Sequence, residues 1–182
     1  MRKLILITAL AVFGFNLSNA QDVSFGVKGG VNLATFTGDD SAEAKGITSY
    51  HVGGLVDIEI TEKFSVQPEV IYSVQGADSD LGDFRLDYIN VPVLAKFMIV
   101  DGLSLEGGPQ IGFLTSSKLE NEDIKDFVKK TDFGAVLGLG YLLDGGLNFA
   151  ARYNFGLSNI SDSDLDVDVK NGVFQLSIGY MF

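Results

Sequence analysis

The chain has 182 residues, 46% of them hydrophobic, and carries 24 Asp and Glu against 13 Lys and Arg, for a formal net charge of −11. This acidic excess argues against nucleic acid as a partner, because phosphate backbones are bound by clustered Lys and Arg. Cysteine is absent, which excludes disulfides, thiolate metal sites and cysteine nucleophiles.

The first predicted element is a signal peptide over residues 1–20. Arg2 and Lys3 precede the apolar run Leu4–Phe15, and Ser18 and Ala20 are small residues at the two positions that a signal peptidase reads. The apolar run is shorter than the roughly 20 residues that a membrane-spanning helix needs. We therefore expect cleavage after Ala20, which leaves one domain over residues 21–182.

An alternation of apolar and polar residues predicts eight β-strands in that domain. Val23, Phe25, Val27, Val31 and Leu33 stand at odd positions, and the residues between them are small or polar. A period of two places one apolar face on a strand. The predicted strands cover residues 23–35, 48–60, 64–75, 87–99, 103–115, 131–143, 147–157 and 172–182.

The connections between these strands alternate in length. The short ones are 61–63, 100–102 and 144–146, and the long ones are 36–47, 76–86, 116–130 and 158–171. Alternation of this kind predicts an all-β fold, an eight-stranded antiparallel up-and-down barrel with tight turns at one rim and long loops at the other.

The two strand faces favour a transmembrane barrel over a soluble lipocalin-like one, in which the apolar face would point inward. The less apolar face is crowded with small residues, as a narrow lumen requires. The apolar face carries aromatic residues near both strand ends, as expected where a wall crosses two headgroup layers. These aromatics are Phe64, Phe97, Tyr141, Phe149, Tyr180 and Phe182 at the short-turn rim, and Tyr50, Tyr72, Phe113, Phe133, Phe155 and Phe174 towards the other.

The last strand ends on an aromatic residue, Phe182, with apolar residues at every second position before it. We expect this strand to pair with the first and close the barrel, because closure removes both edges. The pattern also resembles the C-terminal signal by which the barrel-assembly machinery recognises outer-membrane barrels.

Six segments, taken in order, resemble the PorT-like outer-membrane β-barrel family of Gram-negative bacteria. They are FGVKGGVNLATF, VQPEVIYSVQGA, LDYINVPVLAKF, LSLEGGPQIGFL, the stretch from Thr131 to Ile160, and VFQLSIGYMF. The resemblance implies a small eight-stranded barrel similar to OmpX and the OmpA membrane domain, placed in the outer membrane. Most members have no assigned activity, and the member that gives the family its name is linked to protein secretion.

The predicted lumen contains a polar cluster of Lys28, Glu69, Lys96, Glu106 and Arg152. The short turns set Lys96 opposite Glu106 and Arg152 opposite Gly138, which leaves the guanidinium space. We expect the cluster to be an ionic plug that fills the core. A narrow ion-conducting lumen is the alternative, although eight strands leave an interior filled by side chains.

Two further patterns suggest chemistry but fit it poorly. Ser49 and His51 share the inward face, but residues two apart on a strand stand nearly 7 Å apart at roughly 3.3 Å rise per residue, too far for a nucleophile and its base. Asp162, Asp164, Asp166 and Asp168 resemble part of a calcium loop that lacks its glycine and glutamate. We therefore predict no catalytic, cofactor or metal residues, and keep weak divalent-cation binding as a lesser hypothesis.

The sequence thus predicts a non-enzymatic outer-membrane barrel with a structural or interaction role. Its surface loops or periplasmic turns would contact an unidentified protein, and its wall would contact lipid and lipopolysaccharide. An accessory role in protein secretion follows only from the family resemblance. A lipid-modifying enzyme and a narrow channel remain the alternatives.

Overall fold

The computed structural model describes residues 22–38, 41, 45–79, 82–119, 122–123, 128–161 and 168–182, and the predicted signal peptide lies outside them. Its strands are β1 (Val23–Thr37), β2 (Lys45–Thr61), β3 (Phe64–Ser79), β4 (Gly82–Val100), β5 (Leu103–Leu119), β6 (Glu122–Asp123), β7 (Thr131–Leu142), β8 (Leu147–Gly156) and β9 (Lys170–Met181). Among the described residues, no helix is long and apolar enough to cross a membrane.

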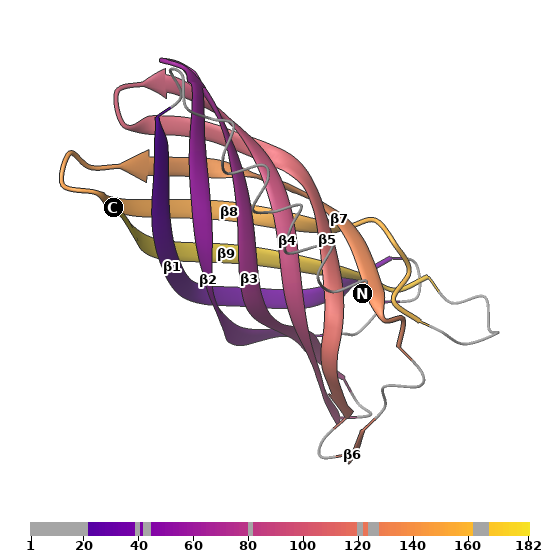
Figure 1. Cartoon of the computed structure of the whole chain (residues 1–182). Coiled ribbons are helices and arrows are strands. Elements are labelled where there is room, and N and C mark those ends of the chain that lie inside the picture. Colours follow the sequence, from indigo (N-terminus) through magenta and orange to yellow (C-terminus); the bar gives the residue numbers. More distant parts are fainter. Residues whose placement is uncertain are drawn as a thin grey trace, which may run out of the picture.

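Eight of these strands form a closed antiparallel barrel, as predicted (Figure 1). Each pairs with its neighbours in sequence, and β9 pairs with β1 from Gly26↔Met181 to Thr37↔Lys170. Among the described residues, the two-residue strand β6 pairs only with the end of β5, so it is not part of the wall. The backbone N–H of Phe182 donates to the carbonyl of Phe25, so the chain ends inside the sheet pairing.

The strands extend further at the long-loop end than the sequence pattern indicates. The segment 76–86 was expected to be a long loop, and this prediction is wrong for most of it. β3 runs to Ser79 and β4 starts at Gly82, with Ala77 opposite Phe84. Here the outward face carries polar residues such as Asp83 and Arg85, so the alternation that marks a lipid-facing strand ends before the strand does.

Three neighbouring strands, β3, β4 and β5, pass well beyond the aromatic residues Tyr72 and Phe113. We call the projecting part the tongue. It consists of residues 73–79, 82–88 and 114–119. At about 3.3 Å per residue, each of these segments is about 20 Å long. By contrast, β7 and β8 end within two residues of Phe133 and Phe155, so the long-loop rim of the barrel is uneven.

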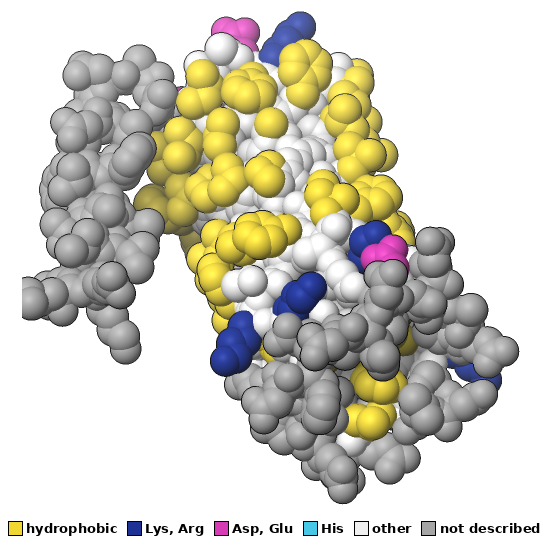
Figure 2. Space-filling model, turned by 90° about the vertical axis from the view of Figure 1, so that its right-hand side faces the viewer, with side chains coloured by type: hydrophobic (Ala, Val, Ile, Leu, Met, Phe, Trp, Pro, Cys, Tyr) yellow, Lys and Arg dark blue, Asp and Glu magenta, His cyan; other side chains and the backbone are white. Residues whose placement is uncertain are grey.

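The outer wall is apolar. Exposed hydrophobic residues include Val31, Tyr50, Leu105, Leu139 and Ile178, and Figure 2 shows hydrophobic side chains as a broad band, with Lys and Arg beyond its two ends. Residues at the alternate positions, such as Lys28, Asn32 and Glu106, are buried in the lumen. The prediction that the apolar face points outward is confirmed.

Candidate functional site

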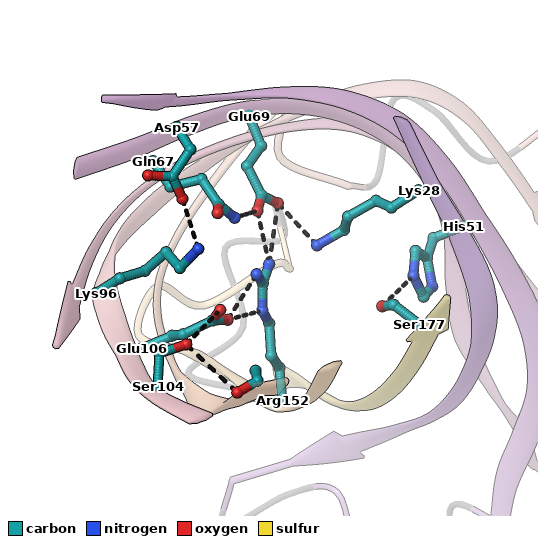
Figure 3. A network of polar contacts seen from close by, with 11 residues as sticks. Lys28, His51, Asp57, Gln67, Glu69, Lys96, Ser104, Glu106, Arg152 and Ser177 are labelled. Atoms are coloured by element: carbon teal, nitrogen blue, oxygen red, sulfur yellow. Dashed lines mark hydrogen bonds and ion pairs between the residues drawn. The ribbon is translucent and has the colours of Figure 1, made fainter. Parts of the chain in front are cut away.

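The lumen is crossed by a network of ion pairs centred on Arg152 of β8 (Figure 3). Its Nη2 lies 2.6 Å from Glu106 Oε2 on β5, and its Nε lies 2.7 Å from the same oxygen. Its Nη1 lies 2.8 Å from Glu69 Oε1 on β3. One guanidinium therefore joins opposite sides of the barrel through charge-assisted hydrogen bonds, which are the strong kind.

Lys28 of β1 completes this network, because its Nζ lies 2.9 Å from Glu69 Oε2. Glu69 also accepts a 2.5 Å hydrogen bond from the amide of Gln67. The four charged side chains are at least 96% buried. Two cations and two anions cancel, so the buried charges compensate one another, as buried ions must. We call Lys28, Glu69, Glu106 and Arg152 the ion network.

Lys96, the fifth residue predicted for this cluster, has a different partner. Its backbone is opposite Glu106, as predicted, but its Nζ lies 2.5 Å from Asp57 Oδ2 on β2. Figure 3 shows this pair beside the ion network. The sequence does not indicate this pair, because registers within a hairpin can be counted from its turn, whereas contacts across the lumen cannot.

Glycines on β7 make room for the ion network. Gly138 lies opposite Arg152, as predicted, and a Cβ there would stand 2.6 Å from Arg152 Cγ. A Cβ at Gly140 would crowd the carboxylate of Glu106, standing 3.0 Å from its Cδ. Small residues on the inner face are therefore a packing requirement of this charged core.

A second polar network lies around His51, which is 1% exposed. Asn32 Nδ2 donates to the carbonyls of Tyr50 and Val74, so its Oδ1 faces His51 Nδ1 at 2.7 Å. This assigns the proton to Nδ1 and leaves Nε2 to accept from Ser177 Oγ at 2.8 Å. His51 is thus held on both sides.

Ser49 does not join this network. Its hydroxyl donates to the carbonyl of Val74 at 2.6 Å, and it forms no hydrogen bond with His51 in the described part of the chain. The serine that does contact His51 is Ser177 of β9, which lies far away in sequence and which sequence analysis did not single out. Barrel closure brings the two together, since both flank Gly30 of β1.

Asn32 should contribute strongly to stability through this network. Replacing it with leucine removes an acceptor from His51 and Gln175 and leaves buried polar groups unpaired, at about 1–3 kcal/mol for each. We expect Asn32→Leu to lower the free energy of unfolding by about 3 kcal/mol in urea titrations of the barrel in lipid vesicles.

Asn154→Leu is the matched control, since Asn154 is also a buried lumen asparagine but its amide has no hydrogen-bond partner among the described residues. Asn154→Leu should lower the free energy of unfolding clearly less than Asn32→Leu does. Equal losses would show that Asn32 contributes through its shape and not through its hydrogen bonds.

An apolar cluster lies at the long-loop end of the barrel. Leu86, Tyr88 and Leu114 pack against Val128 and Ile160, which come from the connections after β5 and β8. Those connections are tied by a bridge between Val128 and Ser161 and by the hydrogen bond from the Lys129 N–H to the Ile160 carbonyl. We call this cluster the apolar cap.

The lumen is open at the short-turn end. There a cavity of about 180 Å³ reaches inward as far as Lys28, Glu106 and Arg152. Asp57 and Lys96 line its wall. The ion network forms the inner end of this cavity, and the apolar cap lies beyond it. The described residues contain no group of three or more His, Cys, Asp or Glu side chains arranged to hold a metal.

A comparison with protein families matches residues 19–162 to the model of the outer membrane protein β-barrel domain. The chain belongs to this family. It is therefore an outer-membrane protein, with its short turns towards the periplasm and its long loops outside, the orientation of such barrels. The comparisons do not show the narrower PorT-like assignment, and no curated protein matches the chain.

Solved structures share the fold. Neisserial surface protein A has a TM-score of 0.61 at 14% identity, with 88% of this chain and 99% of that chain covered. Ail, the attachment invasion locus protein of Yersinia pestis, gives 0.54 at 20%, with the same coverage. OprG from Pseudomonas aeruginosa gives 0.51 at 14%, with 89% and 97% covered. At these identities the likeness is one of fold.

Proposed function

We propose that this outer-membrane barrel is an interaction protein, which uses its membrane wall as an anchor and presents its extracellular tongue to a protein partner. The observation that carries the proposal is the filled lumen. Because the ion network and the apolar cap occupy the interior, the outer surface is the part of the protein that can contact a partner. Eight-stranded barrels generally have interiors filled by side chains.

The tongue supports this proposal by its shape and surface. It extends about 20 Å along its strands beyond Tyr72 and Phe113, and its outward face carries Arg85 opposite Lys118, both exposed. Its inward face is anchored by Leu86 and Ser117, which are 1% exposed. A rigid, paired sheet with charged side chains on its outside can present a fixed surface to a partner at low ordering cost.

Site-specific photocrosslinking in whole cells tests the proposal. A photoreactive amino acid at Arg85 should give a discrete protein adduct, while the same amino acid at Asp144, in the periplasmic turn after β7, should give none. Adducts from position 144 alone would place the contact in the periplasm. Adducts from neither position, in cells that insert the barrel normally, would contradict an interaction role.

The wall and the last strand would have partners of their own. Exposed Lys129 and Lys130 lie next to Thr131, at the outer end of β7, where lipopolysaccharide phosphates are within reach of basic side chains. The assembly machinery would engage β9, whose terminal Phe182 is 75% exposed.

The resemblance to the PorT-like family extends the proposal to an accessory role in secretion. Comparison of secreted proteins from cells with and without the gene tests this extension.

We assign no catalytic step to the barrel. His51 is enclosed, and its two ring nitrogens are bonded to Asn32 and Ser177, so a lipid ester has no route to the pair in the described structure. If His51→Gln abolished a lipid A modification seen by mass spectrometry, a lipid-modifying enzyme would become the better assignment.

A further inference from the structure

The seam between β1 and β9, meaning the line along which these two strands pair, differs from the other seams of the wall. β1 is the first wall strand and β9 the last, so no turn or loop joins them directly, whereas every other neighbouring pair is joined by a connection. A connection keeps two strands close together after their hydrogen bonds break, so they re-pair readily. The seam between β1 and β9 lacks this constraint and is held closed by non-covalent contacts.

Backbone pairing supplies one part of these contacts. It runs without a register shift from Gly26↔Met181 to Thr37↔Lys170, and the hydrogen bond from the Phe182 N–H extends it at the short-turn end. Backbone pairing is common to all seams of the wall, so it does not compensate for the missing connection.

A hydrogen bond inside the lumen crosses the seam. His51 belongs to β2, yet its Nε2 accepts at 2.8 Å from Ser177 Oγ of β9, and Figure 3 shows the two side chains reaching toward each other. Between them lies β1, with Gly30 opposite both residues. A Cβ at Gly30 would stand 2.9 Å from His51 Cε1. The bond therefore passes over β1 at a position that carries no side chain.

A second hydrogen bond joins the two strands of the seam directly. Gln175 Nε2 of β9 donates at 2.9 Å to Asn32 Oδ1 of β1, and the two residues are opposite in the pairing. Asn32 is itself held by β3, because its Nδ2 donates at 2.8 Å to the Val74 carbonyl. We call Asn32, His51, Gln175 and Ser177 the seam cluster. All four are buried, where hydrogen bonds are stronger and reinforce one another.

We propose that the seam cluster is a closure lock, which holds the barrel shut at the seam that has no connecting segment. Its bonds to β9 form only when β9 pairs with β1, because that pairing brings Gln175 and Ser177 within reach. They therefore stabilise the closed barrel and not an open form, whose two free strand edges could pair with other chains. The proposal does not depend on the tongue having a partner.

Amide hydrogen exchange of the folded barrel in lipid vesicles, followed by mass spectrometry, tests the proposal. Ser177→Ala removes the hydroxyl from β9 and leaves His51 Nε2 buried without its donor. We expect exchange in residues 26–37 and 170–181 to become about tenfold faster, since a lost buried hydrogen bond favours opening by about that factor. Exchange in residues 103–113 and 131–141, which form the seam between β5 and β7, should stay at the wild-type rate.

Ser104→Ala is the matched control. Ser104 is also a buried lumen serine, and its hydroxyl donates to the Gly140 carbonyl across the seam between β5 and β7, whose strands a connection joins. This variant should leave exchange in β1 and β9 unchanged. Gln175→Leu removes the other bond to β9 and should repeat the effect of Ser177→Ala. It provides the test if Ser177→Ala does not show the heat-dependent gel shift of a folded barrel.

An engineered disulfide shows whether faster exchange comes from the seam. The chain has no cysteine, so Val31→Cys with Leu176→Cys gives one defined pair, at two exposed positions that lie opposite each other. Oxidation of this pair in the Ser177→Ala background should restore slow exchange, and reduction should reverse the effect. The proposal is overturned if Ser177→Ala leaves exchange in β1 and β9 unchanged, if it speeds exchange equally in all strands, or if the disulfide does not restore slow exchange.

Discussion

Arg152→Ala is expected to destabilise the barrel by about 3–5 kcal/mol, because it leaves buried carboxylates without their counter-charge. Among the described residues, Glu106 would lose its only ion pair, and Glu69 would keep only the one with Lys28. The measurement is the midpoint of urea unfolding in lipid vesicles. We also expect the variant to unfold at a lower temperature in the heat-dependent gel shift of folded barrels.

The double variant Arg152→Ala/Glu106→Gln separates lost charge balance from lost packing. It removes one cation and one anion and keeps the 2.9 Å pair between Lys28 and Glu69, so the remaining network is again neutral. We expect it to recover a large part of the stability lost in the single variant. If the double variant were less stable than Arg152→Ala, charge compensation would not be the role of the ion network.

Gly138→Val is expected to prevent folding or to lower stability by several kcal/mol, because overpacking a filled core forces the backbone to move. The new Cβ would stand 2.8 Å from Arg152 Cα and 2.6 Å from its Cγ, so the main chain of β8 is in the way. The measurement is the fraction of protein that shows the heat-dependent gel shift after refolding.

Gly54→Val is the control for this substitution. Gly54 lies within β2 and is exposed on the lipid side, and a Cβ there would meet only the Gly26 carbonyl oxygen at 3.8 Å. Valine should be neutral or slightly stabilising, since glycine weakens strand interiors. Equal damage from both variants would mean that strand glycines serve the backbone and not the lumen.

The strand number, the short turns and the outward apolar face could be predicted because each depends on local alternation. Lys96 opposite Glu106 follows in the same way from counting back from a tight turn. The partner of Lys96 is Asp57 of β2, and β3 lies between their two strands. This contact depends on how far the two side chains reach inside the lumen. The pairing of His51 with Ser177 depends on closure between the first and last strands, and no local pattern marks it.

The tongue was missed for a different reason. Alternation of apolar and polar residues marks a strand whose two faces meet unlike environments. Outside the membrane the outward face meets water instead of lipid, so the outward residues are no longer apolar. Strand pairing continues there, as between Gly76 and Arg85, without the apolar signal. The positive φ of Gly76 (133°) marks a local irregularity, and the sequence alone indicates only a glycine. The aspartates 162, 164 and 166, considered for divalent cations, lie outside the described residues.

Conductance in planar lipid bilayers tests the central claim most directly, namely that the lumen is filled and that the protein acts through its outer surface. The sample should first show the heat-dependent gel shift, so that only folded barrels are inserted. We expect the wild-type protein to insert without conductance steps, because the ion network and the apolar cap occupy the lumen. Regular steps from the folded wild type would contradict the account and make a narrow channel the better assignment.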